Sequence, residues 1–230
     1  MYADDLILIA KSTLGLQEHL LSLEHFCRSV GMQVNISKMK VVVFSKKRKH
    51  NQHKFYSEGN NLEEVADYKY LGIDFNKNLS LNGCRKKRTL GGWKAFYAFQ
   101  NRCREAKLWD WKTTQTLFGL LVSSVILYGC ELWANNTSDM QWRQIEKIQK
   151  CFITNKFKIK NAIPYASLLS ERDVIPIEVI AMVQVIRYLK KIEQMEEGRW
   201  QRLSLMTDCE REKILGCNKI TNGLVNGVFS

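Results

Sequence analysis

Two adjacent carboxylates, Asp4 and Asp5, stand directly before the apolar run 6–10. Carboxylates about 4 Å apart repel each other, and a divalent cation between them reverses that cost. Mg²⁺ prefers such hard oxygen ligands, and paired metal ions stabilise the attacking and leaving oxygens of a phosphoryl transfer. The pair therefore predicts a catalytic magnesium site at Asp4 and Asp5. A solvated acidic turn is the alternative, because aspartate is common in turns.

Three basic clusters predict contacts with a phosphate backbone. The 230 residues include 35 Lys and Arg against 23 Asp and Glu, a net charge of +12, which favours polyanionic partners. The clusters are Lys46, Lys47, Arg48 and Lys49; Arg85, Lys86, Lys87 and Arg88; and Arg143, Lys147 and Lys150. The cluster at 46–49 also fits a nuclear localisation signal. For this cluster and for the one at 143–150, the alternative is an ordinary solvated surface. The second opens a predicted helix, whose start favours an external anion.

The first part of the chain must place the acidic pair on a strand. Short apolar runs predict strands, and the amphipathic stretch 14–30 followed by Gly31 predicts a helix. The predicted strands are 6–10, 41–44, 55–56 and 70–75. Residues 1–80 are therefore expected to form a small domain with a sheet and helices.

The second part of the chain has a helical period in its apolar residues. Helices are predicted at about 84–107, 112–134, 140–157 and 174–197, with a loop around Pro164. Residues 84–200 thus form a predicted all-helical domain, and 201–230 a poorly ordered tail. The predicted fold class is α+β.

The aromatic side chains of this second part are predicted to pack in its core. They lie on one helical face or beside apolar stretches, where packing is commoner than stacking on bases. They are Trp93, Phe96, Tyr97, Trp109, Trp111, Phe118 and Trp133.

Several classes of protein are excluded or disfavoured. Seven widely spaced cysteines indicate free thiols in a reducing, intracellular compartment, with the nucleus left open, and the N-terminus lacks the pattern of a targeting segment. The uncharged stretch 117–130 is short for a bilayer span, so a buried core helix is expected and no membrane partner. The histidines and cysteines form no zinc pattern, and no Walker loop occurs.

Four motifs along the chain are informative together: Tyr2-Ala3-Asp4-Asp5-Leu6; Gly31 to Lys38 before a strand; Tyr68 to Ile73; and Leu127 to Trp133. They stand in the order found in reverse transcriptases of non-LTR retrotransposons of the long-interspersed-element type, and the chain resembles that family over about residues 2–190. The segment 171–189 also looks like the one that follows the thumb motif of this family.

The resemblance implies an RNA-directed DNA polymerase, a nucleotidyltransferase that uses Mg²⁺, an RNA template and a DNA primer. Asp4 would be the main metal ligand with Asp5 beside it, and Lys38 would lie near the nucleotide phosphates. The hairpin residues Tyr70, Leu71 and Gly72 would grip the primer. Residues 1–80 would be a partial palm, and 84–200 the thumb.

The chain also departs from the family pattern. The family has fingers and further palm motifs upstream, including another metal-binding aspartate, whereas this sequence begins one residue before the aspartate box. Asp74 is a poor substitute on strand geometry, and Met39 stands where the family has threonine. We expect a truncated enzyme that is inactive alone, and whether another chain supplies the missing half stays open. The alternatives are a non-catalytic nucleic-acid-binding module and a relic without a role.

Overall fold

A computed structural model describes residues 5–44, 53–159, 163–199 and 201–203. The chain divides into two compact units, unit 1 (Met1–Lys87) and unit 2 (Arg88–Ser230). The fold is helix-rich with a few small strand pairs, so the general α+β class is correct. Asp4, the basic cluster 46–49 and the tail from residue 204 lie outside the described residues.

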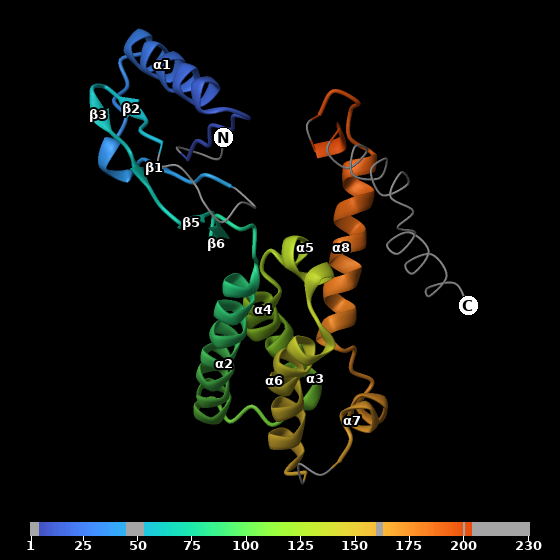
Figure 1. Cartoon of the computed structure of the whole chain (residues 1–230). Coiled ribbons are helices and arrows are strands. Elements are labelled where there is room, and N and C mark those ends of the chain that lie inside the picture. Colours follow the sequence, from blue (N-terminus) through green and yellow to red (C-terminus); the bar gives the residue numbers. More distant parts are fainter. Residues whose placement is uncertain (1–4, 45–52, 160–162, 200, 204–230) are drawn as a thin grey trace. The chain divides into compact units, whose positions relative to one another are not determined.

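The first helix of unit 1, α1 (Thr13–Ser29), forms where the amphipathic pattern predicts it (Figure 1). It begins because the hydroxyl of Ser12 accepts a hydrogen bond from the amide of Gly15 at 3.1 Å. It ends before Gly31, whose φ of +67° is a left-handed conformation that glycine adopts without strain.

The strands of unit 1 are shorter than the sequence predicts, and they form three separate pairs. A parallel pair joins β1 (Lys40–Val41) to β4 (Glu63–Glu64), and antiparallel pairs join β2 (Tyr56–Ser57) to β3 (Asn60–Asn61) and β5 (Asp67–Tyr70) to β6 (Ile73–Asn76). The predicted single strand 70–75 therefore covers the last residue of β5, the turn at Leu71 and Gly72, and most of β6. Of the predicted strand 41–44 only Val41 lies in β1. Val41 is buried and Val43 packs against the core, whereas Phe44 is exposed.

The predicted strand 6–10 is wrong. Residues 6–10 belong to no helix or strand, and the side chain of Ile9 is 81% exposed. A strand is stable only when a neighbour satisfies its backbone amides and carbonyls. The apolar composition of 6–10 meets one requirement of a strand, and among the described residues no second strand meets the other.

The core of unit 1 is small. It consists of Leu20 from α1, Val41 from β1, and Phe55 and Leu62 from the β2–β3 hairpin region. Leu8, Leu16, Ile36, Met39 and Val43 pack against these buried residues. The core therefore joins α1 to the strand pairs, and Leu8 is the point at which the 6–10 segment joins it.

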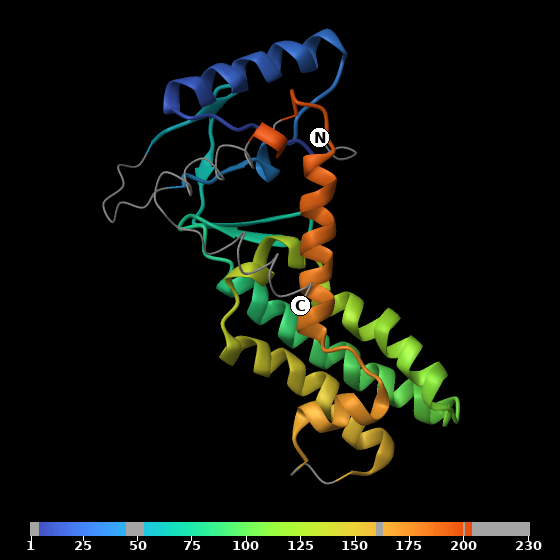
Figure 2. The same ribbon diagram turned by 90° about the vertical axis from the view of Figure 1, so that its right-hand side faces the viewer.

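Unit 2 consists of helices, and α2 crosses the boundary between the units. Its elements are α2 (Asn82–Glu105), α3 (Trp111–Phe118), the π turn η2 (Gly119–Ser123), α4 (Ser124–Leu127), α5 (Cys130–Trp133), the 3-10 turn η3 (Ala134–Asn136), α6 (Asp139–Phe157), α7 (Tyr165–Arg172) and α8 (Ile177–Glu193). The last of these, α8, packs against α5 and α6 (Figures 1 and 2).

Two features of unit 2 differ from the sequence prediction. The predicted helix 112–134 breaks at Gly129, whose φ of +66° is left-handed, and the chain turns by 49° between Trp111–Leu127 and Cys130–Asn136. The predicted loop around Pro164 instead contains α7, which starts directly after that proline. Proline at a helix start is harmless because the amide it lacks has no partner there.

The aromatic side chains pack as predicted, with two exceptions, Trp109 and Tyr97; Tyr97 is 57% exposed, with its ring stacked on that of Trp93. The ring of Phe118 stacks on Phe152 with centroids 4.3 Å apart, and Trp111 stacks on Phe152 at 5.3 Å. Trp133 is fully buried. Trp109, however, is 75% exposed, so its predicted place in the core is wrong.

No single helix among the described residues has the length and apolar content to cross a membrane. The bent pair of Trp111–Leu127 and Cys130–Asn136 reaches that length and composition only when its two parts are taken together.

Neighbouring glycines in α2 provide a matched test of the packing in unit 2. A Cβ on Gly92 would lie 2.5 Å from Cγ1 of Ile126 and 3.0 Å from Cδ1 of Ile148, whereas a Cβ on Gly91 would lie 3.4 Å from Val125. Gly91→Ala should stabilise the chain by about 0.5–1 kcal/mol through helix propensity. Gly92→Ala should destabilise it by about 1–2 kcal/mol through overpacking. Urea unfolding of both variants measures the difference, and equal effects would contradict the close packing.

Candidate functional site

The structure describes one of the two predicted metal ligands. Asp5 is exposed directly before the segment 6–10, and Asp4 lies outside the described residues. No group of three or more His, Cys, Asp or Glu close enough to hold a metal ion occurs in the described part of the chain. The carboxylate of Asp74 pairs with the ammonium group of Lys87 at 2.7 Å. The described residues thus do not assemble a ligand set for Mg²⁺.

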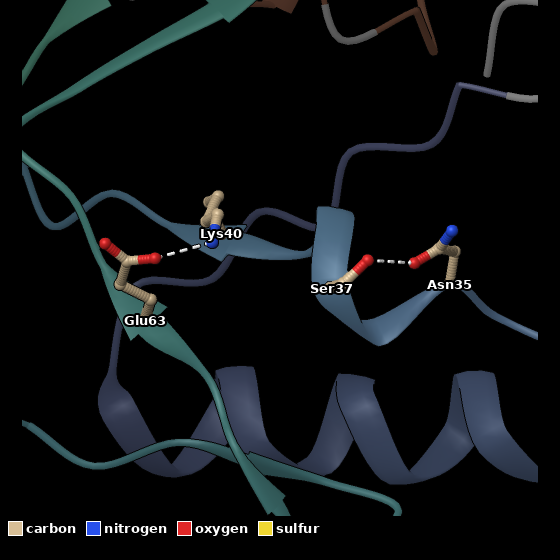
Figure 3. Close-up of polar contacts among 4 residues, drawn as sticks. All are labelled: Asn35, Ser37, Lys40 and Glu63. Atoms are coloured by element: carbon tan, nitrogen blue, oxygen red, sulfur yellow. Dashed lines mark hydrogen bonds and ion pairs between the residues drawn. The ribbon is translucent and has the colours of Figure 1, made fainter.

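Lys38 ends a short 3-10 turn, η1 (Ile36–Lys38), that connects α1 to β1. Figure 3 shows the turn fixed on one side, where the hydroxyl of Ser37 donates to Oδ1 of Asn35 at 2.6 Å. On the other side, Lys40 forms an ion pair with Glu63 at 2.5 Å, across the parallel β1–β4 pair (Figure 3). Lys38 itself is exposed and forms no ion pair within the described residues. Its ammonium group is therefore accessible to an anion from solvent.

Tyr70, Leu71 and Gly72 form the tip of the β5–β6 hairpin. Tyr70 pairs with Ile73, and the two residues between them have φ values of +45° at Leu71 and +80° at Gly72. Positive φ at both central residues is the geometry that suits a two-residue hairpin turn. Glycine adopts it freely, whereas leucine does so at a cost in backbone energy. The turn presents Leu71 at the surface.

The basic cluster at residues 85–88 is not one exposed patch. Arg85 is 7% exposed and donates to the side-chain oxygen of Asn82, and burial lowers its pKa. Lys87 is bound to Asp74, while Lys86 is exposed. The guanidinium group of Arg88 lies over the ring of Tyr128, 4.5 Å from its centroid, a cation–π contact. The four neighbours in sequence thus have different surroundings.

The basic residues of α6 do form a row on one face, the α6 basic row: Arg143, Lys147 and Lys150. Arg143 and Lys147 are exposed, and Lys150 is half-buried. The opposite face of α6 is buried through Ile145, Ile148 and Phe152. The predicted amphipathic helix is therefore confirmed, and Arg143 and Lys147 are the best-exposed part of the row.

Sequence reasoning missed a buried amide on the same helix. The side-chain carbonyl of Gln149 accepts hydrogen bonds from the amide of Ile177 at 3.2 Å and from the hydroxyl of Tyr165. Its amide group donates to the carbonyl of Ile175 at 2.9 Å. Gln149 thereby holds the starts of α7 and α8 against α6. The available signal in the sequence was a single side-chain amide, Gln149, among the apolar residues that α6 buries.

Two carboxyl groups, those of Glu146 and Glu178, have raised pKa values beside Tyr165 of this hydrogen-bond network. The pKa of Glu146 is raised to about 7, mainly by burial and to a smaller extent by repulsion from Glu178. The pKa of Glu178 is raised mainly by burial and to a smaller extent by repulsion from Asp139. The hydroxyl of Tyr165 also has a raised pKa, because it is buried beside these two acids. Glu146 stands three residues after Arg143 and four before Lys150, so this poorly solvated side of α6 borders the face of the basic row.

The motif Leu127 to Trp133 has a structural role. The thiol of Cys130 donates to Oε1 of Gln184 on α8 at 2.8 Å, and burial raises its pKa to about 12. The indole of Trp133 donates to the carbonyl of Tyr128 at 3.3 Å. Because Gly129 bends the chain here, Cys130 meets α8 directly, and the buried ring of Trp133 lies beside that of Trp142 on α6. A thiol with so high a pKa is a poor nucleophile, so the motif serves packing.

Comparisons with known proteins give one relative. No model of a known protein family matches the chain, and no solved structure matches it. The chain is 30% identical over 139 residues to a Caenorhabditis elegans protein named "Putative uncharacterized transposon-derived protein". The match covers 59% of this chain and 48% of that protein, so the chain spans about half the length of the curated relative it matches. This distant similarity points to a transposable-element origin.

The raised pKa of Glu146 predicts a pH-dependent stability. The carboxyl has an ordinary value of 4.5 and a folded-state value of about 7, so the native state holds the proton more tightly than the unfolded state. The stabilisation is complete below pH 4.5 and is lost as the pH rises to about 7. Relative to the natural chain, Glu146→Gln should therefore gain about 1–3 kcal/mol between these pH values.

Urea unfolding at several pH values measures this gain. Glu171→Gln, at an exposed position of α7, is the matched control and should show no such trend. A constant difference between Glu146→Gln and the natural chain across this range would contradict a buried, proton-binding Glu146.

Proposed function

We propose that the chain derives from the reverse transcriptase of a non-LTR retrotransposon and binds primer–template nucleic acid through its helical unit. The four motifs in family order support the reverse-transcriptase ancestry, and the transposon-derived relative supports the mobile-element origin. The observation that carries the binding function is the α6 basic row. It combines exposed cations on one helix face with a buried face that fixes the helix.

The spacing within the row suits a nucleic-acid backbone. Arg143 and Lys147 are four residues apart, so they are separated by about 6 Å along the helix axis. Successive phosphates of one strand are about 3.4 Å apart along the duplex axis, so every second phosphate recurs at a similar distance. Each cation can therefore contact its own phosphate. The net charge of +12 adds a long-range attraction.

The palm assignment of unit 1 is part of the same proposal. In the parent enzyme, Asp4 and Asp5 would hold Mg²⁺, Lys38 would contact nucleotide phosphates, and Tyr70 to Gly72 would position the primer. The exposed ammonium of Lys38 and the surface turn at Leu71 are compatible with these roles. The RNA template and the DNA primer are the proposed partners.

A non-catalytic nucleic-acid-binding module is the second candidate. The α6 basic row favours it, because the row requires no metal and no upstream motif. A primer-extension assay separates the two candidates. Extension that Asp4→Ala abolishes would assign polymerase activity to this chain, whereas binding without extension would assign the module.

The salt dependence of binding tests the proposed contacts. The affinity for an RNA–DNA hybrid should fall linearly with salt in a log–log plot, and the slope counts the phosphate contacts. The double variant Arg143→Gln/Lys147→Gln should reduce the slope by about 1–2 units, because it removes two contacts. Fluorescence anisotropy with a labelled hybrid at four or more salt concentrations measures it.

Lys190→Gln/Lys191→Gln is the matched control. It also removes two exposed charges from a helix of unit 2, but Glu193, Glu196 and Glu197 follow closely in the sequence. The control should leave the slope nearly unchanged. Equal slopes for the two double variants would contradict a specific contact by the α6 basic row.

A further inference from the structure

Among the described residues of unit 2, Trp109 is the most exposed large aromatic side chain, with 75% of it exposed. It lies in the connection between α2 and α3, which can be followed in Figure 1. Trp133 and Trp142 of the same unit are buried. An exposed indole forgoes the apolar burial that stabilises the other two, so packing does not account for its position.

The backbone on both sides of Trp109 is fixed. The amide of Leu108 donates to the carbonyl of Cys103 at 2.9 Å, and the ammonium group of Lys156 on α6 donates to the carbonyl of Leu108 at 3.2 Å. On the other side, the carboxylate of Asp110 caps α3 by accepting from the amide of Thr113 at 2.7 Å. That hydrogen bond lowers the pKa of Asp110. The indole therefore projects from a loop whose backbone is already ordered, so little conformational entropy is lost when a ligand binds.

The charges around Trp109 favour a polyanion. Within residues 102–112 the cations are Arg102, Arg104, Lys107 and Lys112, and the acids are Glu105 and Asp110. Four positive and two negative charges leave a local excess of two positive charges. None of the four cations forms an ion pair with another described residue. Asp110 keeps its charge while it caps α3, so the sequence on either side of the indole carries a net positive charge of two.

We propose that Trp109 is a stacking surface for an unpaired base of single-stranded nucleic acid, with the flanking cations contacting its phosphates. Aromatic side chains combined with a basic surface are the general means of binding single strands, because every base presents a flat face. A duplex hides those faces, so the contact is selective for single strands. The inference rests on the nucleic-acid binding proposed above, but it concerns a different surface and a different kind of contact.

The test compares single-stranded oligothymidylate with a DNA duplex of equal length, using the full chain at the same series of salt concentrations for both. Trp109→Ala should weaken single-strand binding about tenfold, because one stacking contact is lost, and should leave duplex binding unchanged. It should also leave the log–log salt slope unchanged, because no phosphate contact is removed. Trp109→Phe should retain most of the affinity, because phenylalanine also stacks.

Leu120→Ala is the matched control, since Leu120 is a large apolar side chain of the same unit and is 64% exposed. It should bind like the natural chain. If Trp109→Ala binds single strands normally while the natural chain still binds the hybrid, this inference is wrong and the proposed function stands. If the natural chain binds neither, both are wrong. Equal weakening of single-strand and duplex binding by Trp109→Ala would also overturn the stacking role.

Discussion

The buried face of α6 is the contact on which the rest of unit 2 depends. Its Phe152 stacks on Phe118 at 4.3 Å, and the ring centroid of its Trp142 lies 5.7 Å from that of Trp133. Gln149 adds three hydrogen bonds that hold the starts of α7 and α8. Close packing of this kind leaves a helix little freedom to rotate. The direction of the outward side chains of α6 is therefore set by its inward ones, which is why the basic row can act as one surface.

Helices with a regular apolar period were predictable from the sequence, and features that depend on distant contacts were not. The prediction 14–30 agrees closely with α1 (Thr13–Ser29), because the period and the glycine stop are both local. Periodicity instead predicts a continuous helix through Gly129, since a glycine within an apolar run has no local reason to adopt positive φ. The break is stabilised by the contacts of Cys130 and Trp133 with other parts of the chain.

The candidate site shows the same limit at the level of side chains. Adjacent cations such as Arg85 and Lys87 look equivalent in the sequence, yet one is buried beside Asn82 and the other pairs with Asp74. Trp109 has apolar neighbours in the sequence but an exposed place in the fold. The alternation of Arg143 and Lys147 with buried apolar residues was predictable, because a helix converts spacing directly into faces.

The π turn Gly119–Ser123 lies between α3 and α4 and sets how their buried faces are related. Such a turn accommodates one residue more than the α-helical turn it replaces, and each residue of a helix advances by about 100°. Deleting one residue within the turn would let it close as an ordinary α-helical turn, so α3 and α4 could keep their buried faces. Deleting one residue from α4 has no such compensation, because the residues beyond it would rotate by roughly 100° and the side chains of Val122 and Ile126 could not both stay inward. The π turn is therefore the place between residues 111 and 127 where the loss of one residue disturbs the packing least.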